Sequence, residues 1–163
     1  MQERDEIADT IDNLIQIHGG RVLSLLGRLL GDPEDARDAY QETWCAVWRA
    51  ERRLRKAVDP WPFIRKAAVG KAVDRLRKKG AERSAPIDQE LAGRSKPPAE
   101  AASVDLAFLP ARERTALTLF FWEGLSVREI GAELGAPEET VKTWMARGRE
   151  RLREQLTKQD DEV

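Results

Sequence analysis

Two carboxylates in and beside the segment "YQETWCAVWRA", residues 40–50, have the spacing to bind a basic surface on another molecule. Asp38 and Glu42 lie four residues apart, so a helix would place them on one face, where like charges repel each other by roughly 0.2–0.5 kcal/mol. A cation supplied by a partner would relieve that repulsion. The alternative is local and at least as strong on physical grounds, because acids near a helix N-terminus are stabilised by the positive end of the helix dipole.

Two basic clusters could bind the phosphates of a nucleic acid. Residues 65–83 hold eight bases against two acids, and residues 140–153 hold five bases against one acid. Residues 1–43, in contrast, hold ten acids against four bases. The formal net charge of −1 argues against indiscriminate coating of nucleic acid. The charge pattern therefore indicates one acidic end and two separate basic patches.

The first basic cluster follows two aromatic residues, Trp61 and Phe63, which could stack on unpaired bases. The side chains that we expect to follow the phosphates are Arg75, Arg77, Lys78, Lys79 and Arg83. This combination suits single-stranded DNA. In the alternative interpretation, both aromatic side chains pack the start of a helix onto the core, and the basic residues are simply solvated.

The second basic cluster lies on a predicted DNA-reading helix. The residues that we expect to enter the major groove are Thr140, Lys142, Thr143 and Arg147. Further along, three arginines would bind backbone phosphates: Arg149, Arg151 and Arg153. The alternative is a solvated basic face that pairs with Glu150 and Glu154.

Composition argues against several other kinds of site. The single cysteine, Cys45, cannot form an internal disulfide, and the single histidine, His18, leaves no cluster with metal-ligand spacing. We therefore expect no metal, no cofactor and no enzymatic activity. The charged N-terminal segment lacks an apolar signal core, and no apolar run approaches the roughly 20 residues of a membrane span. These features predict a cytoplasmic protein without a membrane span.

Helices are predicted to position these residues, because apolar residues recur at three- and four-residue spacing between glycine and proline signals. The first helix is expected over about residues 5–30, with Gly19–Gly20 as a candidate interruption. The second is expected to begin at Pro33, behind the N-cap Asp32, and to run to about Arg55.

The opening segment falls on this second helix, and its side chains divide between two faces. The residues expected in the core are Tyr40, Trp44, Val47 and Trp48. The residues expected on the opposite face are Asp38, Glu42, Cys45, Arg49 and Arg52, with Gln41 at the margin.

A third helix is predicted from the signal Asp59–Pro60 to a stop near Gly80. Beyond it the chain is rich in alanine, proline, serine and glycine, which is typical of a flexible linker. The expected organisation is a helical domain over residues 1–80, a linker over 81–104 and a second helical domain over 105–160.

The C-terminal domain has the pattern of a helix-turn-helix. A helix ending at Gly124 is followed by a short helix that Ser126 and Glu129 would cap and Gly135 would end. A longer basic helix begins at Pro137. The expected core comprises Leu125, Val127, Ile130, Leu134, Val141 and Met145. The predicted fold class is therefore all-α, with two small helical domains joined by a flexible linker, the C-terminal one a helix-turn-helix.

Three segments together resemble one protein family: "LLGDPEDARDAYQETWCAVWRA", "PFIRKAAVGKAVDRLRKK" and "LPARERTALTLFFWEGLSVREIGAELGAPEETVKTWMARGRERLRE". They are similar to the two helical domains, called regions two and four, of bacterial RNA polymerase sigma factors of the extracytoplasmic-function class. The resemblance covers most of the chain outside the linker and termini. The last segment alone is less specific, because response-regulator output domains carry a similar pattern.

The resemblance implies that Asp38, Gln41 and Glu42 match the motif that docks on the clamp helices of the largest subunit of core RNA polymerase. It implies that residues 52–83 capture and help melt the minus-ten element of promoter DNA. By the same likeness, Lys142, Thr143 and Arg147 would read the duplex minus-thirty-five element, and the linker would thread through polymerase. RNA synthesis would belong to the core enzyme, and an anti-sigma factor is a further candidate partner.

Four residues depart from what is common in this family. Gly70 replaces an asparagine in the predicted melting helix, and Glu139 replaces a small residue near the start of the recognition helix. Trp144 and Ala146 replace a basic and a larger residue. These changes are consistent with an unusual promoter sequence or with a weakened grip on DNA.

Two other functions compete with an initiation factor. A sigma mimic would bind polymerase or an anti-sigma partner without productive promoter binding, which Gly70, Glu139 and the small net charge favour. A stand-alone helix-turn-helix regulator would bind duplex DNA tightly without polymerase and would not need Asp38, Gln41 and Glu42. An enzyme ranks far behind, because the sequence has no phosphate-binding loop and no nucleophile paired with a base.

Overall fold

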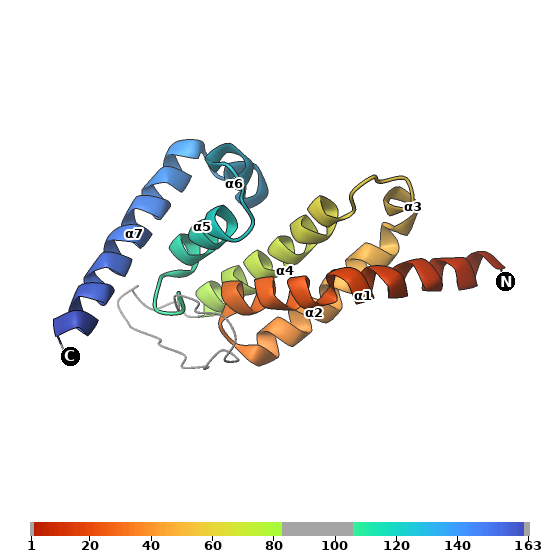
Figure 1. The fold of residues 1–163 in the computed structure, drawn as a ribbon, viewed down its shortest axis with the longest axis horizontal. Helices are drawn as coiled ribbons and strands as arrows, with labels where there is room; N and C mark the ends of the chain where they lie inside the picture. Colours follow the sequence, from red (N-terminus) through yellow and green to blue (C-terminus); the bar gives the residue numbers. More distant parts are fainter. Residues whose placement is uncertain (1, 83–105, 162–163) are drawn as a thin grey trace. The chain divides into compact units, whose positions relative to one another are not determined.

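The computed structural model describes residues 2–82 and 106–161, which form helices joined by turns (Figure 1). The chain divides into two compact units, residues 1–85 and 86–163. The prediction of an all-α fold with two helical domains is confirmed. Apart from two residues that continue a helix, the predicted linker, residues 81–104, lies outside the described part of the chain.

Three long helices build the first unit, and each packs against the other two: α1, Gln2–Leu30; α2, Pro33–Arg49; and α4, Trp61–Glu82. A four-residue helix, α3, Glu51–Leu54, follows α2. The side chains that fill the centre of the unit are fully buried: Val22, Leu25, Leu26, Leu29, Val47, Ile64 and Val69. The amphipathic faces predicted from the sequence therefore meet in one shared core.

Local signals set the end of α1 and the starts of α2 and α4 as predicted. Gly31 adopts a positive φ of 71° directly after α1, a conformation that glycine adopts without steric cost. Asp32 then caps α2, since its Oδ1 accepts a hydrogen bond from the backbone N–H of Glu34 at 2.8 Å. Asp59 does the same for α4, accepting from the N–H of Trp61 at 3.0 Å. The α4 helix passes Gly80 and ends at Glu82.

The interruption considered at Gly19–Gly20 does not occur, and α1 is continuous. Gly19 serves packing instead, because a Cβ atom at this position would lie 2.8 Å from the hydroxyl oxygen of Tyr40 on α2. The absent side chain leaves room for the Tyr40 hydroxyl against α1. A glycine within a helix pattern therefore marks a helix contact here, not a break.

The α2 helix ends earlier than predicted. Ala50, with φ −99° and ψ 8°, leaves the helical conformation and separates α2 from α3, so the expected continuous helix to Arg55 is wrong. After this change of direction, Glu51 and Leu54 are both buried. Burial of these two side chains against the unit is the tertiary effect that the local sequence did not indicate.

The second unit contains α5, Ala111–Phe121; α6, Val127–Leu134; and α7, Glu138–Asp161. Helices α6 and α7 form the predicted helix-turn-helix (Figure 1). Ser126 and Glu129 form the capping box, and Gly135 ends α6 with a positive φ of 63°.

The turn of this motif also depends on Gly131 within α6. A Cβ atom at this glycine would lie 2.7 Å from the carbonyl oxygen of Ala136. In turn, Ala136 donates its backbone N–H to the carbonyl of Gly131 at 3.0 Å. Of the predicted core residues, Leu125, Ile130, Val141 and Met145 are buried, whereas Val127 and Leu134 are only half-buried.

Candidate functional site

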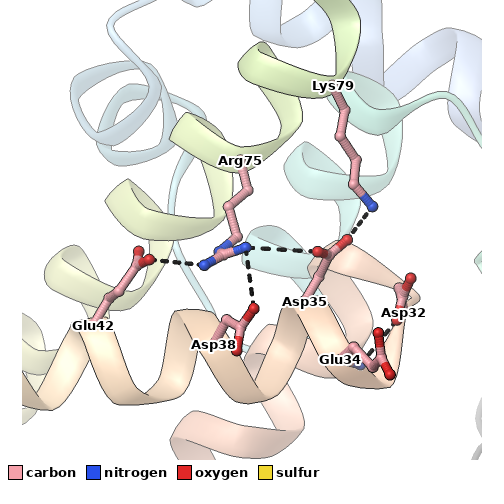
Figure 2. Close-up of polar contacts among 7 residues, drawn as sticks. All are labelled: Asp32, Glu34, Asp35, Asp38, Glu42, Arg75 and Lys79. Atoms are coloured by element: carbon pink, nitrogen blue, oxygen red, sulfur yellow. Dashed lines mark hydrogen bonds and ion pairs between the residues drawn. The ribbon is translucent and has the colours of Figure 1, made fainter. Parts of the chain in front are cut away.

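The acidic face of α2 packs beside α4, and Arg75 of α4 reaches between its carboxylates (Figure 2). Arg75 Nη2 donates to Glu42 Oε1 at 2.7 Å. Its Nη1 lies 3.6 Å from Asp35 Oδ1 and 3.7 Å from Asp38 Oδ2. We call Asp35, Asp38 and Glu42 the α2 acidic cluster. The cation that relieves the repulsion between Asp38 and Glu42 therefore comes from the same unit.

The three carboxylates differ in accessibility. The side chains of Asp38 and Glu42 are 67% and 48% exposed, and Gln41 is also exposed. Asp35 is only 16% exposed and forms a second ion pair with Lys79 of α4 (Figure 2). Asp38, Gln41 and Glu42 are thus accessible to a partner, whereas Asp35 ties α2 to α4.

The aromatic residues of α2 do not all lie in the core. Trp44 and Val47 are buried as predicted, and Tyr40 is half-buried, but Trp48 is 51% exposed. Its position in the predicted core is therefore wrong. Trp48 follows Gln41 by seven residues, or nearly two helical turns, so both lie on one side of α2. That spacing was the signal in the sequence that could have placed Trp48 beside the accessible polar residues.

The basic residues of α4 divide between two directions. Arg75 and Lys79 pair with the α2 acidic cluster, so in this structure their charges are directed toward α2. Arg77 and Lys78 are exposed and remain accessible to phosphates. Arg83 lies outside the described residues. Half of the four described cations predicted to bind DNA thus have acidic partners within the unit.

Trp61 is buried, with 5% exposure. Its ring stacks on His18 with a centroid separation of 5.7 Å, and the guanidinium of Arg21 lies 3.8 Å from the ring centroid. The burial contradicts the prediction that Trp61 presents an exposed stacking platform and fits the alternative, in which it packs the start of α4 onto α1. Phe63 is half-buried.

The same helix carries Gly70 on its exposed side. A Cβ atom built at Gly70 meets no atom within 4 Å, so the structure has room for a side chain there. Packing does not explain why this position is glycine.

The recognition helix α7 exposes Lys142, Thr143, Arg147 and Arg149, while Thr140 is half-buried. Lys142 Nζ donates to Glu139 Oε1 at 3.1 Å. Thr143 donates its hydroxyl to the backbone carbonyl of Glu139 at 2.9 Å. Arg147 and Arg149 are the described basic residues of this set to which the structure assigns no acidic partner.

Other contacts hold α7 on α5. Arg151 Nε lies 3.2 Å from Glu113 Oε2, a carboxylate that is itself buried. The guanidinium of Arg112 lies 5.6 Å from the centroid of the Trp144 ring, within the range of a cation–π interaction. Arg151, predicted to bind phosphate, thus already pairs with a buried acid.

Among the described residues, no group of three or more His, Cys, Asp or Glu side chains is placed to hold a metal ion. In the same part of the chain, every helix is too short or too polar to cross a membrane.

Comparison with known proteins relates both units to one family. Residues 14–82 match the family model of sigma-70 region 2, and residues 106–152 match sigma-70 region 4. The chain is 33% identical over 148 residues to the extracytoplasmic-function (ECF) sigma factor SigM of Mycobacterium tuberculosis, an alignment that covers 86% of this chain and 74% of SigM. The chain belongs to the ECF RNA polymerase sigma factors. Proteins of this family are transcription initiation factors and not enzymes.

Other ECF sigma factors align over nearly the whole chain. SigE of Mycolicibacterium smegmatis is 32% identical over 93% of this chain, which spans 63% of SigE. SigW of Bacillus subtilis is 29% identical, with coverage of 94% of this chain and 90% of SigW.

Two solved structures share the fold of this ECF sigma factor. The sigma factor RpoE of Bartonella quintana, solved with the anti-sigma factor NepR, has a TM-score of 0.66 at 22% identity and covers 91% of this chain and 97% of its own. CnrH, solved with the cytosolic domain of CnrY, has a TM-score of 0.56 at 21% identity, with coverage of 92% and 89%.

Proposed function

We propose that this ECF sigma factor docks on the clamp helices of the largest subunit of core RNA polymerase through Asp38, Gln41 and Glu42. The observation that carries the proposal is the accessibility of these three polar side chains on α2, within the unit that matches sigma-70 region 2. Charged and amide groups on a helix face suit a basic helical partner, because electrostatic complementarity sets the orientation of docking. Trp48 extends this face and supplies the kind of aromatic anchor that is enriched at binding hot spots.

Promoter recognition is assigned to the two basic patches. Arg77, Lys78 and Phe63 on α4 are proposed to hold the melted strand of the minus-ten element, while Lys142, Thr143, Arg147 and Arg149 on α7 are proposed to bind the duplex minus-thirty-five element. Arginine and lysine near the start of a recognition helix can reach guanine acceptors or phosphates. The proposed function implies a cytoplasmic protein, because bacterial promoter DNA and RNA polymerase lie in the cytoplasm.

Transcription in vitro tests this function directly. Purified protein and bacterial core polymerase would be incubated with a genomic DNA library, and transcript starts would be mapped by sequencing. We expect discrete starts that share two spaced upstream elements. Binding to core polymerase without any transcript start would contradict the proposed role in directing polymerase to promoters. Absence of binding to core polymerase would contradict the docking assignment.

A set of substitutions tests the docking face itself. Replacing Asp38 by Asn, Gln41 by Ala and Glu42 by Gln removes the proposed contacts while keeping the size of both acidic side chains. The control replaces two exposed acids elsewhere in the same unit, Asp12 by Asn and Glu34 by Gln. Weaker core binding in the first variant alone would support docking through α2. Equal losses in both variants would attribute the effect to net charge.

A second function, as a sigma mimic that engages a protein partner without productive initiation, is favoured by one observation. Glu139 holds Lys142 in an ion pair at the start of the recognition helix, which opposes phosphate binding there. The sigma factor RpoE, which shares this fold, was solved in complex with the anti-sigma factor NepR, and this supports an anti-sigma factor as the partner class. If core binding occurs without transcript starts, Gly70 and Glu139 are the first residues to replace.

A further inference from the structure

We propose that Arg75 is a positioning residue for polymerase docking, which holds the carboxylates of Asp38 and Glu42 where a basic partner meets them. The inference rests on the docking role proposed above for α2. It also removes Arg75 from the set of DNA contacts predicted from the basic patch.

The guanidinium of Arg75 lies among all three carboxylates of the α2 acidic cluster. Nη2 donates a hydrogen bond to Glu42, and Nη1 lies near the carboxylates of Asp35 and Asp38 (Figure 2). The side chain is only 22% exposed, and its Nε is buried without a hydrogen-bond partner in the described part of the chain. The two terminal nitrogens therefore set its orientation. A planar guanidinium can bridge several oxygens in this way, whereas an ammonium acts as a point charge.

The cluster keeps capacity for an external cation. The side chains of Asp38 and Glu42 stay 67% and 48% exposed although Arg75 contacts one oxygen of each. Three carboxylates face two cations, Arg75 and Lys79, so one negative charge remains. Arg75 thus orders the two accessible acids without neutralising the face.

Lys79 separates the roles of the three acids. It pairs with Asp35, the least accessible member of the cluster, and so leaves Arg75 as the described cation in contact with Glu42 and Asp38. Without Arg75, these two like-charged side chains would repel and sample several rotamers, and docking would then have to order them. Immobilising a side chain opposes association, so a preformed arrangement binds more tightly.

The test is a double-mutant cycle on core polymerase affinity, measured with the full-length chain and without DNA. We expect Arg75→Gln to weaken binding by about three- to tenfold, the loss expected when one or two side chains must be ordered on docking. In a Glu42→Gln background the same substitution should have a much smaller effect, because Arg75 acts through that carboxylate. The matched control is Arg37→Gln, an exposed arginine on α2 next to Asp38, which should leave affinity unchanged.

Three results would overturn the assignment: Arg75→Gln binding core as tightly as the unsubstituted protein or more tightly, equal losses in the two backgrounds, or an equal loss from Arg37→Gln. A protein that fails to bind core even without substitution would overturn the proposed docking function, and this inference with it. Folding is checked by circular dichroism. If Arg75→Gln does not fold, the cycle is run with Arg75→Lys, which keeps the charge but loses the planar fork, and unchanged affinity would again overturn the proposal.

Discussion

Glu139 and Lys142 form an ion pair one turn apart at the start of the recognition helix, with 3.1 Å between Oε1 and Nζ. Both side chains are more than half exposed, so the pair contributes little to stability. Its importance is positional. It places a negative charge, and a competitor for the lysine, at the end of the helix that is proposed to approach DNA phosphates.

Glu139→Ala is therefore expected to tighten binding to promoter DNA several-fold. The substitution releases Lys142 and removes a negative charge that faces the negative phosphates. If Lys142 then contacts a phosphate, the slope of log K for DNA binding against log salt concentration should become steeper by about one. The measurement is a salt titration of DNA affinity for the polymerase complex. The control is Glu138→Ala, which removes a neighbouring exposed acid without releasing Lys142; an equal gain from both variants would mean that only overall charge matters.

Arg147→Ala is expected to reduce recognition of the upstream promoter element. A bidentate contact from arginine to guanine contributes about 1–3 kcal/mol of discrimination against other bases. Competition binding with duplexes altered one base pair at a time would reveal which position loses discrimination. Lys158→Ala removes the same charge from an exposed position near the end of α7 and should lower affinity little and evenly. An unaltered promoter profile for Arg147→Ala would assign Arg147 to the solvated surface.

Gly131→Ala is expected to destabilise the helix-turn-helix by about 1–3 kcal/mol, the usual cost of forcing atoms into a packed site. The new Cβ would meet the Ala136 carbonyl oxygen at 2.7 Å, and backbone cannot move aside as a side-chain end can. Gly70→Ala is the control. It meets no atom, so it should stabilise α4 by about 0.5–1 kcal/mol through helix propensity. Urea unfolding followed by circular dichroism would measure both, and similar stability of the two variants would contradict the close approach at Gly131.

Trp48→Ala is expected to weaken polymerase binding while changing the free energy of unfolding little, since the ring is half exposed. Trp44→Ala, four residues earlier on the same helix, removes a buried ring and should cost about 3–5 kcal/mol of stability. Thermal unfolding and core affinity measured for both variants separate the two roles. If Trp48→Ala destabilises as much as Trp44→Ala, then Trp48 belongs to the core after all.

The sequence predicted well those features that depend on neighbours along the chain. Asp32 and the Ser126–Glu129 pair marked helix starts, and Gly135 marked a helix end, because each cap bonds backbone groups within four residues. The family motif likewise located the accessible residues of α2. The helical spacing of apolar residues and the capping residues were thus enough to predict the helices and the helix-turn-helix.

Features that depend on distant contacts could not be predicted in the same way. After the break at Ala50, Glu51 and Leu54 are buried, and Trp48 is half exposed although Trp44 on the same helix is buried. Arg75 was grouped with its basic neighbours on α4, but its partners lie 33 to 40 residues earlier on α2. Charge counts along one segment do not reveal acids that another helix presents.

Each helical unit completes its own apolar core, with Val22 and Ile64 in the first and Leu117 and Met145 in the second. A gene segment that encodes one unit can therefore be exchanged by recombination without repacking the interior of the other. Under the roles proposed above, a new preference for the upstream element can thus arise in a lineage that inherits the unit containing α2 unchanged.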